Sequence, residues 1–184
     1  MAELSLRGQL LLDGGKLRGS FFHRSVVLIC QHDSEGAFGL VLNRSTENAI
    51  GEVVIEDLPE SIQEEPLYLG GPVQPGALSY LHYDAFVPNA NVISNVSLGH
   101  SVEELADVAE SYSPEKQIRI FAGYAGWSAG QLDDEMAGES WLSHPASKEI
   151  IFETPAEAMW ASIMKQKSWE QRVLADSPED PSWN

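Results

Sequence analysis

Short apolar runs alternate with turn-forming segments along most of the chain, a pattern typical of a protein that mixes strands and helices. Residues 25–31 (SVVLICQ) are nearly all apolar and rich in β-branched side chains, which predicts a strand buried on both faces. Residues 38–43 predict a second strand, and the polar segment 32–37 predicts a hairpin turn between the two. Further short strands are predicted at residues 9–12, 67–69, 77–83, 91–96, 118–122 and 150–152.

Helices are predicted where apolar residues recur every three or four positions. Residues 101–112 predict one such helix, because Ser101 and Glu104 form a capping box and the apolar residues that follow share one face. Residues 154–165 predict another, opened by a second capping box at Thr154. Shorter helices are predicted at residues 49–58 and 128–136.

The chain has 184 residues, of which 43% are hydrophobic, and this is enough for one domain with its own core. We expect a single domain over residues 1–175 and a disordered acidic tail over residues 176–184. No apolar run approaches the roughly 18 residues of a membrane span, and the N-terminus lacks the pattern of a secretory signal. The one cysteine, Cys30, excludes an internal disulfide and indicates a reducing compartment. We therefore expect a cytoplasmic protein that does not associate with a membrane.

The net charge of −17 is distributed unevenly. Residues 1–44 hold five basic and four acidic residues, a sum of +1, so the remaining 140 residues carry −18. Residues 45–115 contain 13 acidic residues and neither lysine nor arginine. An acidic protein repels the phosphates of DNA, which argues against direct DNA binding. The unevenness itself has two interpretations: a solvated acidic surface, or an anion site in the N-terminal part.

The predicted hairpin gathers polar side chains at its open end. Pairing of the two strands brings Arg24 and Ser25 close to Arg44 and Ser45, with His23 and Asn43 nearby. Two guanidinium groups beside two hydroxyls, an amide and an imidazole predict a pocket for a phosphate or a carboxylate. The alternative is that the arginines pair with acidic residues and only tie the hairpin down. Strand alternation also places Arg24 and His32 on one face of the first strand.

The segment Gly126-Trp127-Ser128-Ala129-Gly130 fits the G-x-S-x-G pattern of serine hydrolases. Asp133 or Asp134 and then His144 follow in the order of a catalytic triad. All three members lie within 17 residues, however, whereas that fold takes them from separate loops, so the spacing disfavours a hydrolase. The alternative is that the glycines let a strand turn tightly into a helix.

Other chemical signatures are missing from the sequence. The five histidines are scattered without H-E-x-x-H, and neither nucleotide-binding glycine motif is present. We therefore expect neither a metal nor a cofactor. Cys30 lies within an apolar run and is predicted to be buried and inert.

Three signatures in this sequence resemble those of the bacterial AlgH/YqgE family. The first comprises residues 22–28, His32 and residues 36–44, and the central one comprises Gly70-Gly71-Pro72-Val73 with Leu81-His82. The third comprises Gly123-Tyr124-Ala125-Gly126-Trp127, Gly130-Gln131-Leu132, Glu135 and Trp141-Leu142. Their order and spacing hold over most of the chain, from about residue 8 to residue 160. The chain departs from the family pattern at Ser45, where proline is usual, and at Ser128-Ala129, where Gly-Pro is usual.

The resemblance implies an α+β fold, a single domain with a mixed, bifurcated β-sheet flanked by helices, and a cytosolic bacterial protein. It does not imply a reaction: the family is uncharacterised, and its label as a transcriptional regulator came from the genetics of alginate production. This sequence shows no helix-turn-helix pattern and no basic recognition helix. A role in transcription is therefore expected to be indirect.

Three functions remain open at this stage. The first is a non-catalytic module that binds a small anionic ligand or a protein partner. The second is an enzyme for a small anionic substrate, with His32 or His82 as general base and the arginines as a clamp. The third is a direct transcriptional regulator, which the charge disfavours. The predicted ligand-binding residues are Arg24, Ser25, His32, Asn43, Arg44, Trp127 and Gln131.

Overall fold

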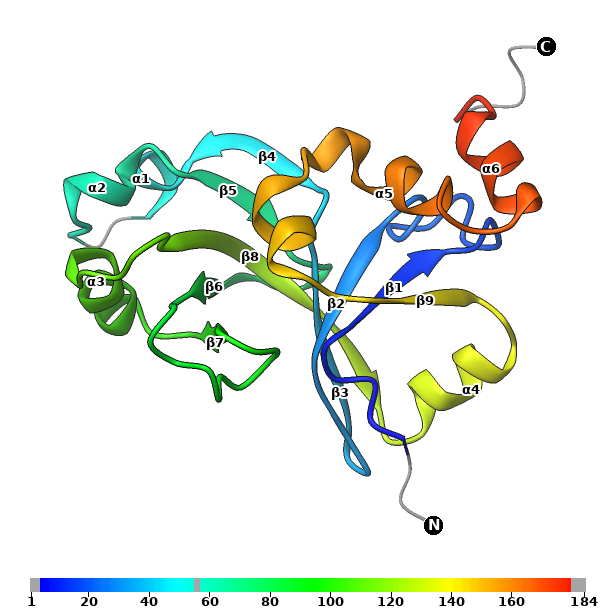
Figure 1. The fold of residues 1–184 in the computed structure, drawn as a ribbon, viewed down its shortest axis with the longest axis horizontal. Coiled ribbons are helices and arrows are strands. Elements are labelled where there is room, and N and C mark those ends of the chain that lie inside the picture. Colours follow the sequence, from blue (N-terminus) through cyan, green and yellow to red (C-terminus); the bar gives the residue numbers. More distant parts are fainter. Residues whose placement is uncertain (1–3, 55–56, 180–184) are drawn as a thin grey trace.

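The computed structural model describes residues 4–54 and 57–179, and in this part of the chain the strands form one mixed sheet. Its main path runs β4-β5-β8-β3-β2-β1-β9, and β6 pairs with both β7 and β8 (Figure 1). The strands are β1 Gln9–Asp13, β2 Val26–Asp33, β3 Gly36–Val41, β4 Ser45–Ala49, β5 Pro66–Leu69, β6 Val73–Tyr83, β7 Val96–Gly99, β8 Gln117–Ser128 and β9 Trp141–Pro145.

Helices flank this sheet in three places. They are α1 Ile50–Val53, α2 Glu60–Gln63, α3 Val102–Glu110, α4 Gln131–Ala137, the π-helix η1 Glu149–Glu153, α5 Ala156–Met164 and α6 Trp169–Asp176. Figure 1 shows α1, α2 and α3 together at one end of the molecule, α5 and α6 at the other, and α4 beside the end of β8. No helix in residues 4–54 and 57–179 has the length and apolar character needed to cross a membrane.

The long strand β8 divides the sheet. Its first part pairs with β6 in antiparallel and with β5 in parallel orientation, whereas residues 125–128 pair with β3. The predicted α+β fold with a mixed, bifurcated sheet is thereby confirmed. The segment Gly70-Gly71-Pro72 of the central signature passes against β8, so that a Cβ on Gly71 would lie 2.0 Å from the carbonyl carbon of Tyr124. Only glycine fits such a close approach of two backbones.

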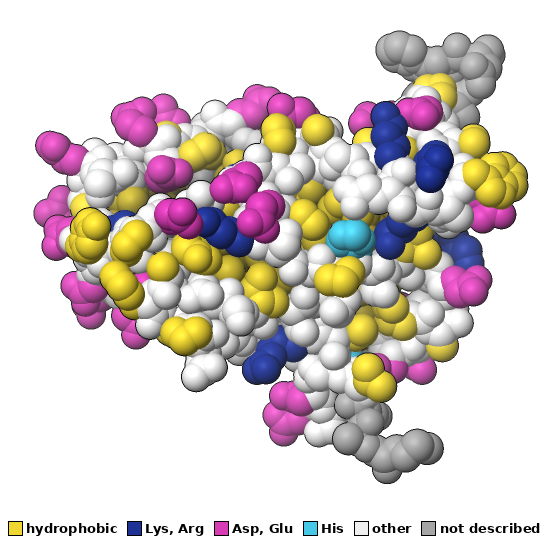
Figure 2. All heavy atoms as spheres, viewed as in Figure 1, with side chains coloured by type: hydrophobic (Ala, Val, Ile, Leu, Met, Phe, Trp, Pro, Cys, Tyr) yellow, Lys and Arg dark blue, Asp and Glu magenta, His cyan; other side chains and the backbone are white. Residues whose placement is uncertain are grey.

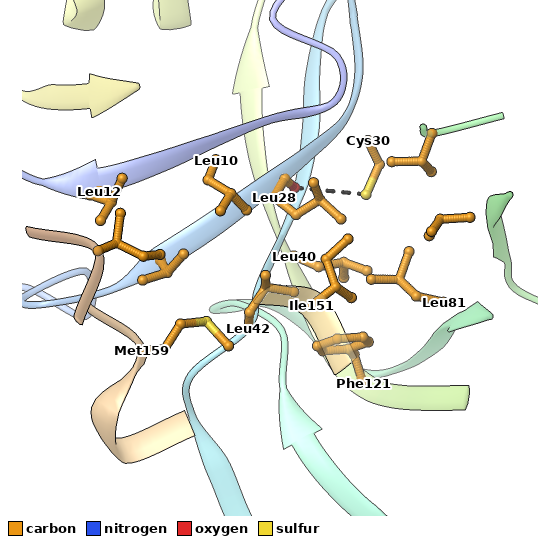
Figure 3. Packing of buried hydrophobic residues seen from close by; sticks show 14 of the residues in the cluster. Leu10, Leu12, Leu28, Cys30, Leu40, Leu42, Leu81, Phe121, Ile151 and Met159 are labelled. Atoms are coloured by element: carbon orange, nitrogen blue, oxygen red, sulfur yellow. Dashed lines mark hydrogen bonds between the residues drawn. The ribbon is translucent and has the colours of Figure 1, made fainter. Parts of the chain in front are cut away.

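The core has separate clusters on the two faces of the β2–β3 hairpin. On one face Leu10, Leu28 and Leu40 pack with Phe121 and with Met159 of α5 (Figure 3). On the other face lies a second cluster, whose buried members include Leu11, Val27, Ile29, Trp127, Leu132 and Trp141. Residues 26–30 are at most 1% exposed, which confirms the prediction of a strand buried on both faces. A third cluster joins α1, α2 and α3 to β5, β6 and β8.

A bulge in β2 overturns one prediction about side-chain direction. The pairing with β3 shifts register between Ile29 and Gln31, so the alternation of faces changes there. Cys30 remains in the core cluster of α5, while His32 contacts α4 on the opposite side. The prediction that His32 shares a face with Cys30 and the residues before it is therefore wrong.

Several predicted elements differ from the structure. The apolar triplet 150–152, predicted as a strand, lies in the π-helix η1, because three apolar residues have too short a period to distinguish strand from helix. The strand predicted at 91–96 is displaced to β7, since the Asn91 side chain bonds both backbone groups of Leu98 and holds the preceding loop. Ser101 caps α3 as predicted, whereas no side chain caps α5.

Four elements were absent from the sequence prediction, namely α2, β4, β9 and α6. The predicted disordered tail, 176–184, begins at the last residue of α6, and its residues 180–184 lie outside the described residues. Ser177 and Pro178, which follow α6, accept hydrogen bonds from Arg24.

Candidate functional site

The seven predicted site residues fall into two groups at opposite ends of the β2–β3 hairpin. At the open end lies the arginine cluster, which we define as Arg24, Ser25, Asn43 and Arg44. At the closed end, Ala37 pairs with both His32 and Trp127. There lies the tryptophan cluster, which we define as His32, Trp127, Gln131, Glu135 and Trp141. The hairpin keeps the two groups apart, so they do not converge in one cavity.

The loop before β2 is organised by Asp13, a fully buried carboxylate. Its Oδ1 accepts hydrogen bonds from the backbone N–H groups of Gly15 (2.8 Å) and Leu17 (3.3 Å). Its Oδ2 accepts from the Arg24 N–H at 2.7 Å and lies 3.6 Å from Nδ1 of His23. Asp13 therefore holds Arg24 in a left-handed backbone conformation, with φ of 54°.

Two members of the arginine cluster, Ser25 and Asn43, use their polar atoms to bond backbone groups at the open end of the hairpin. The Ser25 hydroxyl is buried and donates to the Phe22 carbonyl at 2.8 Å. The Asn43 Oδ1 accepts from the Val26 N–H, and its Nδ2 donates to the Arg24 carbonyl, both at 2.9 Å. Their polar atoms are paired with backbone, so they stabilise the loop rather than face a ligand.

The two arginine side chains lie against the end of the chain. The Arg24 guanidinium lies over the Trp160 ring, 4.8 Å from its centroid, and its Nη2 donates to the carbonyls of Ser177 (2.8 Å) and Pro178 (3.3 Å). Arg44 donates through Nη2 to the carbonyls of Phe21 and His23. Burial lowers the pKa of the Arg44 guanidinium, while the negative charges of Glu179 and Asp13 oppose that shift. The residues after α6 thus contact Arg24 directly, and Arg44 only through the charge of Glu179.

The tryptophan cluster is centred on one carboxylate, Glu135. Its Oε2 accepts from the indole N–H groups of both Trp127 and Trp141 at 2.9 Å, and its Oε1 accepts from the Gln131 amide at 3.1 Å. The bond network joins β8, α4 and β9 in one place. Glu135 belongs to the third signature, but no pattern in the sequence indicates that it lies between the two indoles. This arrangement explains the signature as a structural clamp.

His32 ties the N-terminal segment to the closed end of the hairpin. Its side chain is 4% exposed, with Nδ1 accepting from the Leu6 N–H at 3.0 Å and Nε2 lying 3.5 Å from Oδ1 of Asp133. Since Nδ1 acts as acceptor, the proton of the neutral ring is on Nε2 and faces Asp133.

In the structure, the serine, aspartate and histidine of the possible catalytic triad do not face one another. Ser128 is exposed at the end of β8, and its hydroxyl donates to Oε1 of Gln131 at 3.3 Å. Asp133 faces His32, and His144 lies on β9 opposite Leu10. The arrangement therefore supports the alternative, a tight turn in which Gly130, with φ of 75°, begins α4.

The remaining titratable candidates are shaped by burial. Cys30 is buried, and desolvation raises the pKa of its thiol far above the usual range, so the thiolate does not form. Burial also lowers the pKa of His82, the second candidate base, and the positive charge of Lys116 adds to this effect. In the part of the chain that the structure describes, no three His, Cys, Asp or Glu side chains come together as metal ligands.

Comparison with known proteins gives a consistent result. The AlgH-like family model matches residues 10–172. A UPF0301 protein of Chlorobium limicola is 36% identical over 183 residues, covering 96% of this chain and 95% of its own. A UPF0301 protein of Xylella fastidiosa is 37% identical over 166 residues, covering 87% of this chain and 88% of its own.

Two solved structures resemble this one. The solution structure of the AlgH protein of Pseudomonas aeruginosa has 28% sequence identity and a TM-score of 0.71, covering 97% of this chain and 99% of that one. A crystal structure of a Corynebacterium diphtheriae protein shares the fold, with 22% identity, a TM-score of 0.76, and coverage of 96% and 95%. With the family model spanning most of the chain and full-length relatives above 30% identity, this protein belongs to the AlgH-like family.

Proposed function

We propose that this protein is a non-catalytic binding module, and that its arginine cluster takes an anionic group of a small ligand or of a protein partner. The observation that carries the proposal is the contact of Arg24 with the C-terminal segment, through the carbonyls of Ser177 and Pro178. The acidic side chain of Glu179 adds a negative charge that acts on Arg44. Arg24 thus already binds acceptor atoms of the chain itself, next to an acidic residue.

An external anion would bind the same guanidinium more strongly than these carbonyls do. Arg24 uses Nη2 for neutral carbonyl oxygens, whereas a carboxylate or phosphate forms charge-assisted, bidentate bonds with guanidinium. The ring of Trp160 supports the guanidinium from one side and reduces its freedom, which lowers the entropy lost on binding.

The chemistry around the arginines favours binding over catalysis. The hydroxyl of Ser25 and the amide of Asn43 are bonded to backbone, and His32 lies at the other end of the hairpin. These residues therefore offer the arginines neither a free nucleophile nor a nearby base.

The distribution of charge favours an indirect regulatory role. Figure 2 shows basic side chains concentrated on the half of the molecule that carries α6, and acidic ones around α1, α2 and α3. With a net charge of −17, the protein would reach DNA only against long-range repulsion. We propose that it acts in the cytosol through its ligand or partner, a location that the single buried Cys30 suits.

The test is an NMR titration of the full chain with phosphate, pyrophosphate and citrate. We expect one of these anions to shift resonances of residues 21–24 and 177–179, and Arg24→Gln to weaken its binding by about tenfold or more. Glu179→Gln should strengthen binding slightly, because it removes a competing charge. Arg18→Gln changes an exposed arginine of the same loop and serves as the control. Equal binding by the wild type and Arg24→Gln would contradict the proposal.

A further inference from the structure

A cleft of about 410 Å³ opens where α2 and the ends of α3 and η1 meet β5 and β8. We call it the Arg119 cleft, and none of the seven predicted site residues lines it. Its apolar walls include Ile62 and Phe152, and its polar walls are Ser61, Glu65, Tyr68, Lys116, Gln117 and Arg119. The volume lies within the range of small-molecule sites, about 300–1,000 Å³.

The Arg119 guanidinium is held rigidly but is incompletely paired. It lies over the Tyr68 ring at 4.6 Å from the centroid, and its Nη2 donates to the Phe152 carbonyl at 3.2 Å. Its Nη1 is buried and has no hydrogen-bond partner among the described residues. Burial lowers the pKa of this guanidinium against the opposing charges of Tyr68 and Glu65.

The acceptors of the cleft, Glu65 and Gln117, also have no side-chain partner among the described residues. Burial raises the pKa of the Glu65 carboxyl, and Arg119 only partly offsets this effect. Across residues 4–54 and 57–179, the ion pairs within 4.0 Å do not include one between Glu65 and Arg119. The Oε1 of Gln117 is likewise buried without a partner within that part of the chain.

Lys116, which also lines the cleft, does not compensate Glu65. The Nζ of Lys116 donates to the carbonyls of Val108 (2.9 Å) and Ala109 (2.7 Å), and to that of Ser111. It therefore caps the C-terminal end of α3, where its charge also balances the helix dipole. The cleft keeps one cationic donor and two acceptors, with apolar surface between the elements that supply them.

Such an arrangement is unfavourable unless something binds there. Buried polar groups are nearly always hydrogen-bonded, and an unpaired one costs about 1–3 kcal/mol. The π-helix η1 is a second indication of a binding site, because π-helical turns occur often at functional sites. It supplies the Phe152 ring that lines the cleft and the Phe152 carbonyl that accepts from Arg119. A ligand that supplies a donor to the acidic side and an acceptor to the basic side would satisfy both.

We infer that the Arg119 cleft binds a small amphipathic zwitterion, of the size of a free amino acid. Its ammonium group would face Glu65 and Gln117, and its carboxylate would face Arg119. Its apolar body would lie against Ile62 and Phe152. This inference is independent of the arginine cluster, because the two sites share no residue.

The experiment is calorimetric titration of the full chain with L-leucine and L-phenylalanine. Two probes each lack one charge of leucine, namely 4-methylpentanoate, which has no ammonium group, and isopentylamine, which has no carboxylate. We expect a saturable signal for at least one of the amino acids, and binding weaker by about tenfold or more for each single-charge probe.

Variants assign the signal to the cleft. Glu65→Gln and Arg119→Gln should each weaken binding of the amino acid by about tenfold or more, with folding verified by near-UV circular dichroism. Glu64→Gln, at the adjacent exposed glutamate, should leave it unchanged. Three results would overturn the inference: no saturation by either amino acid, equal binding of a single-charge probe, or full binding by both cleft variants.

Discussion

The arginine cluster and the Arg119 cleft represent opposite uses of polar side chains. At the arginine cluster, Ser25 and Asn43 are bonded to backbone and Arg24 holds the C-terminal segment. At the cleft, Arg119 and Gln117 keep buried atoms without partners within the described residues. A gathering of polar residues in the sequence therefore indicates structure as readily as function. The groups that the fold leaves unpaired indicate more directly where a ligand binds.

The largest expected effect concerns the buried carboxylate below the arginine cluster. Asp13→Ala removes an acceptor from three backbone N–H groups, those of Gly15, Leu17 and Arg24. We expect the free energy of unfolding to fall by about 3 kcal/mol or more, because these donors lose a charged acceptor in a buried site. Urea denaturation measures the change. Asp57→Ala, at an exposed aspartate, should stay within about 0.5 kcal/mol of the wild type.

A smaller loss is expected at the tryptophan cluster, which adds a second network of paired polar groups to the comparison. Glu135→Gln leaves one acceptor oxygen where two indoles and an amide now donate. We expect a loss of about 2 kcal/mol in unfolding free energy, with a changed tryptophan emission in the native state. Glu139→Gln, at an exposed site just beyond α4, is the control. A variant as stable as the wild type would show that the clamp contributes little.

Removal of the Arg24 charge should loosen the C-terminal helix without unfolding the sheet. Arg24→Gln abolishes the contact with Trp160 and weakens the bonds to Ser177 and Pro178. We expect amide hydrogen exchange in α6 to accelerate by about tenfold, equivalent to about 1.4 kcal/mol. Exchange in β2 and β8 should change little. Unchanged exchange in α6 would mean that this helix is held by its apolar contacts alone.

The smallest effect concerns Glu65 and distinguishes the cleft from the paired networks. Because burial raises the pKa of Glu65 in the folded protein, the folded state binds this proton more tightly than the unfolded state. Glu65 therefore destabilises the fold above its raised pKa, and this penalty disappears as the pH falls below the ordinary glutamate value. Glu65→Gln should increase stability at neutral pH by less than about 1 kcal/mol, since the side chain is partly exposed.

The matching control for this prediction is Glu64→Gln, which changes an exposed carboxylate next to it. The two variants should differ in unfolding free energy at pH 7 and agree at pH 4. If Glu65→Gln is less stable than the wild type at pH 7, then Glu65 has a partner in the folded protein that stabilises its charge.

Local elements were predictable where local physics decides them. The apolar run before the turn at residues 32–37 led directly to the hairpin of β2 and β3, and Ser101 caps α3 as its spacing with Glu104 indicates. The signatures also identified the AlgH-like family and its divided sheet correctly. In contrast, residues 150–152 became a π-helix, because a triplet of apolar residues carries no usable period.

Of the predicted site, the sequence led to the proximity of Arg24 and Ser25 to Asn43 and Arg44, because a hairpin register determines neighbours. It did not lead to Asp13 as their organiser, although Asp-Gly-Gly after a strand is a visible turn signal. The sequence also did not predict the bulge at Cys30. Because of this one extra residue, His32 lies on the face of the sheet that contacts α4. Whether the predicted residues bind a ligand stays a prediction.

By itself, therefore, the sequence determined the hairpin, the family and the uneven charge, since each depends on neighbours along the chain. Only the tertiary structure decided which polar atoms have partners. The Arg119 cleft takes its walls from α2, β5, β8 and η1, elements up to 91 positions apart, from Ser61 to Phe152. Hydrogen-bond pairing across such separations depends on where the backbone passes in space, and no local pattern in the sequence records it.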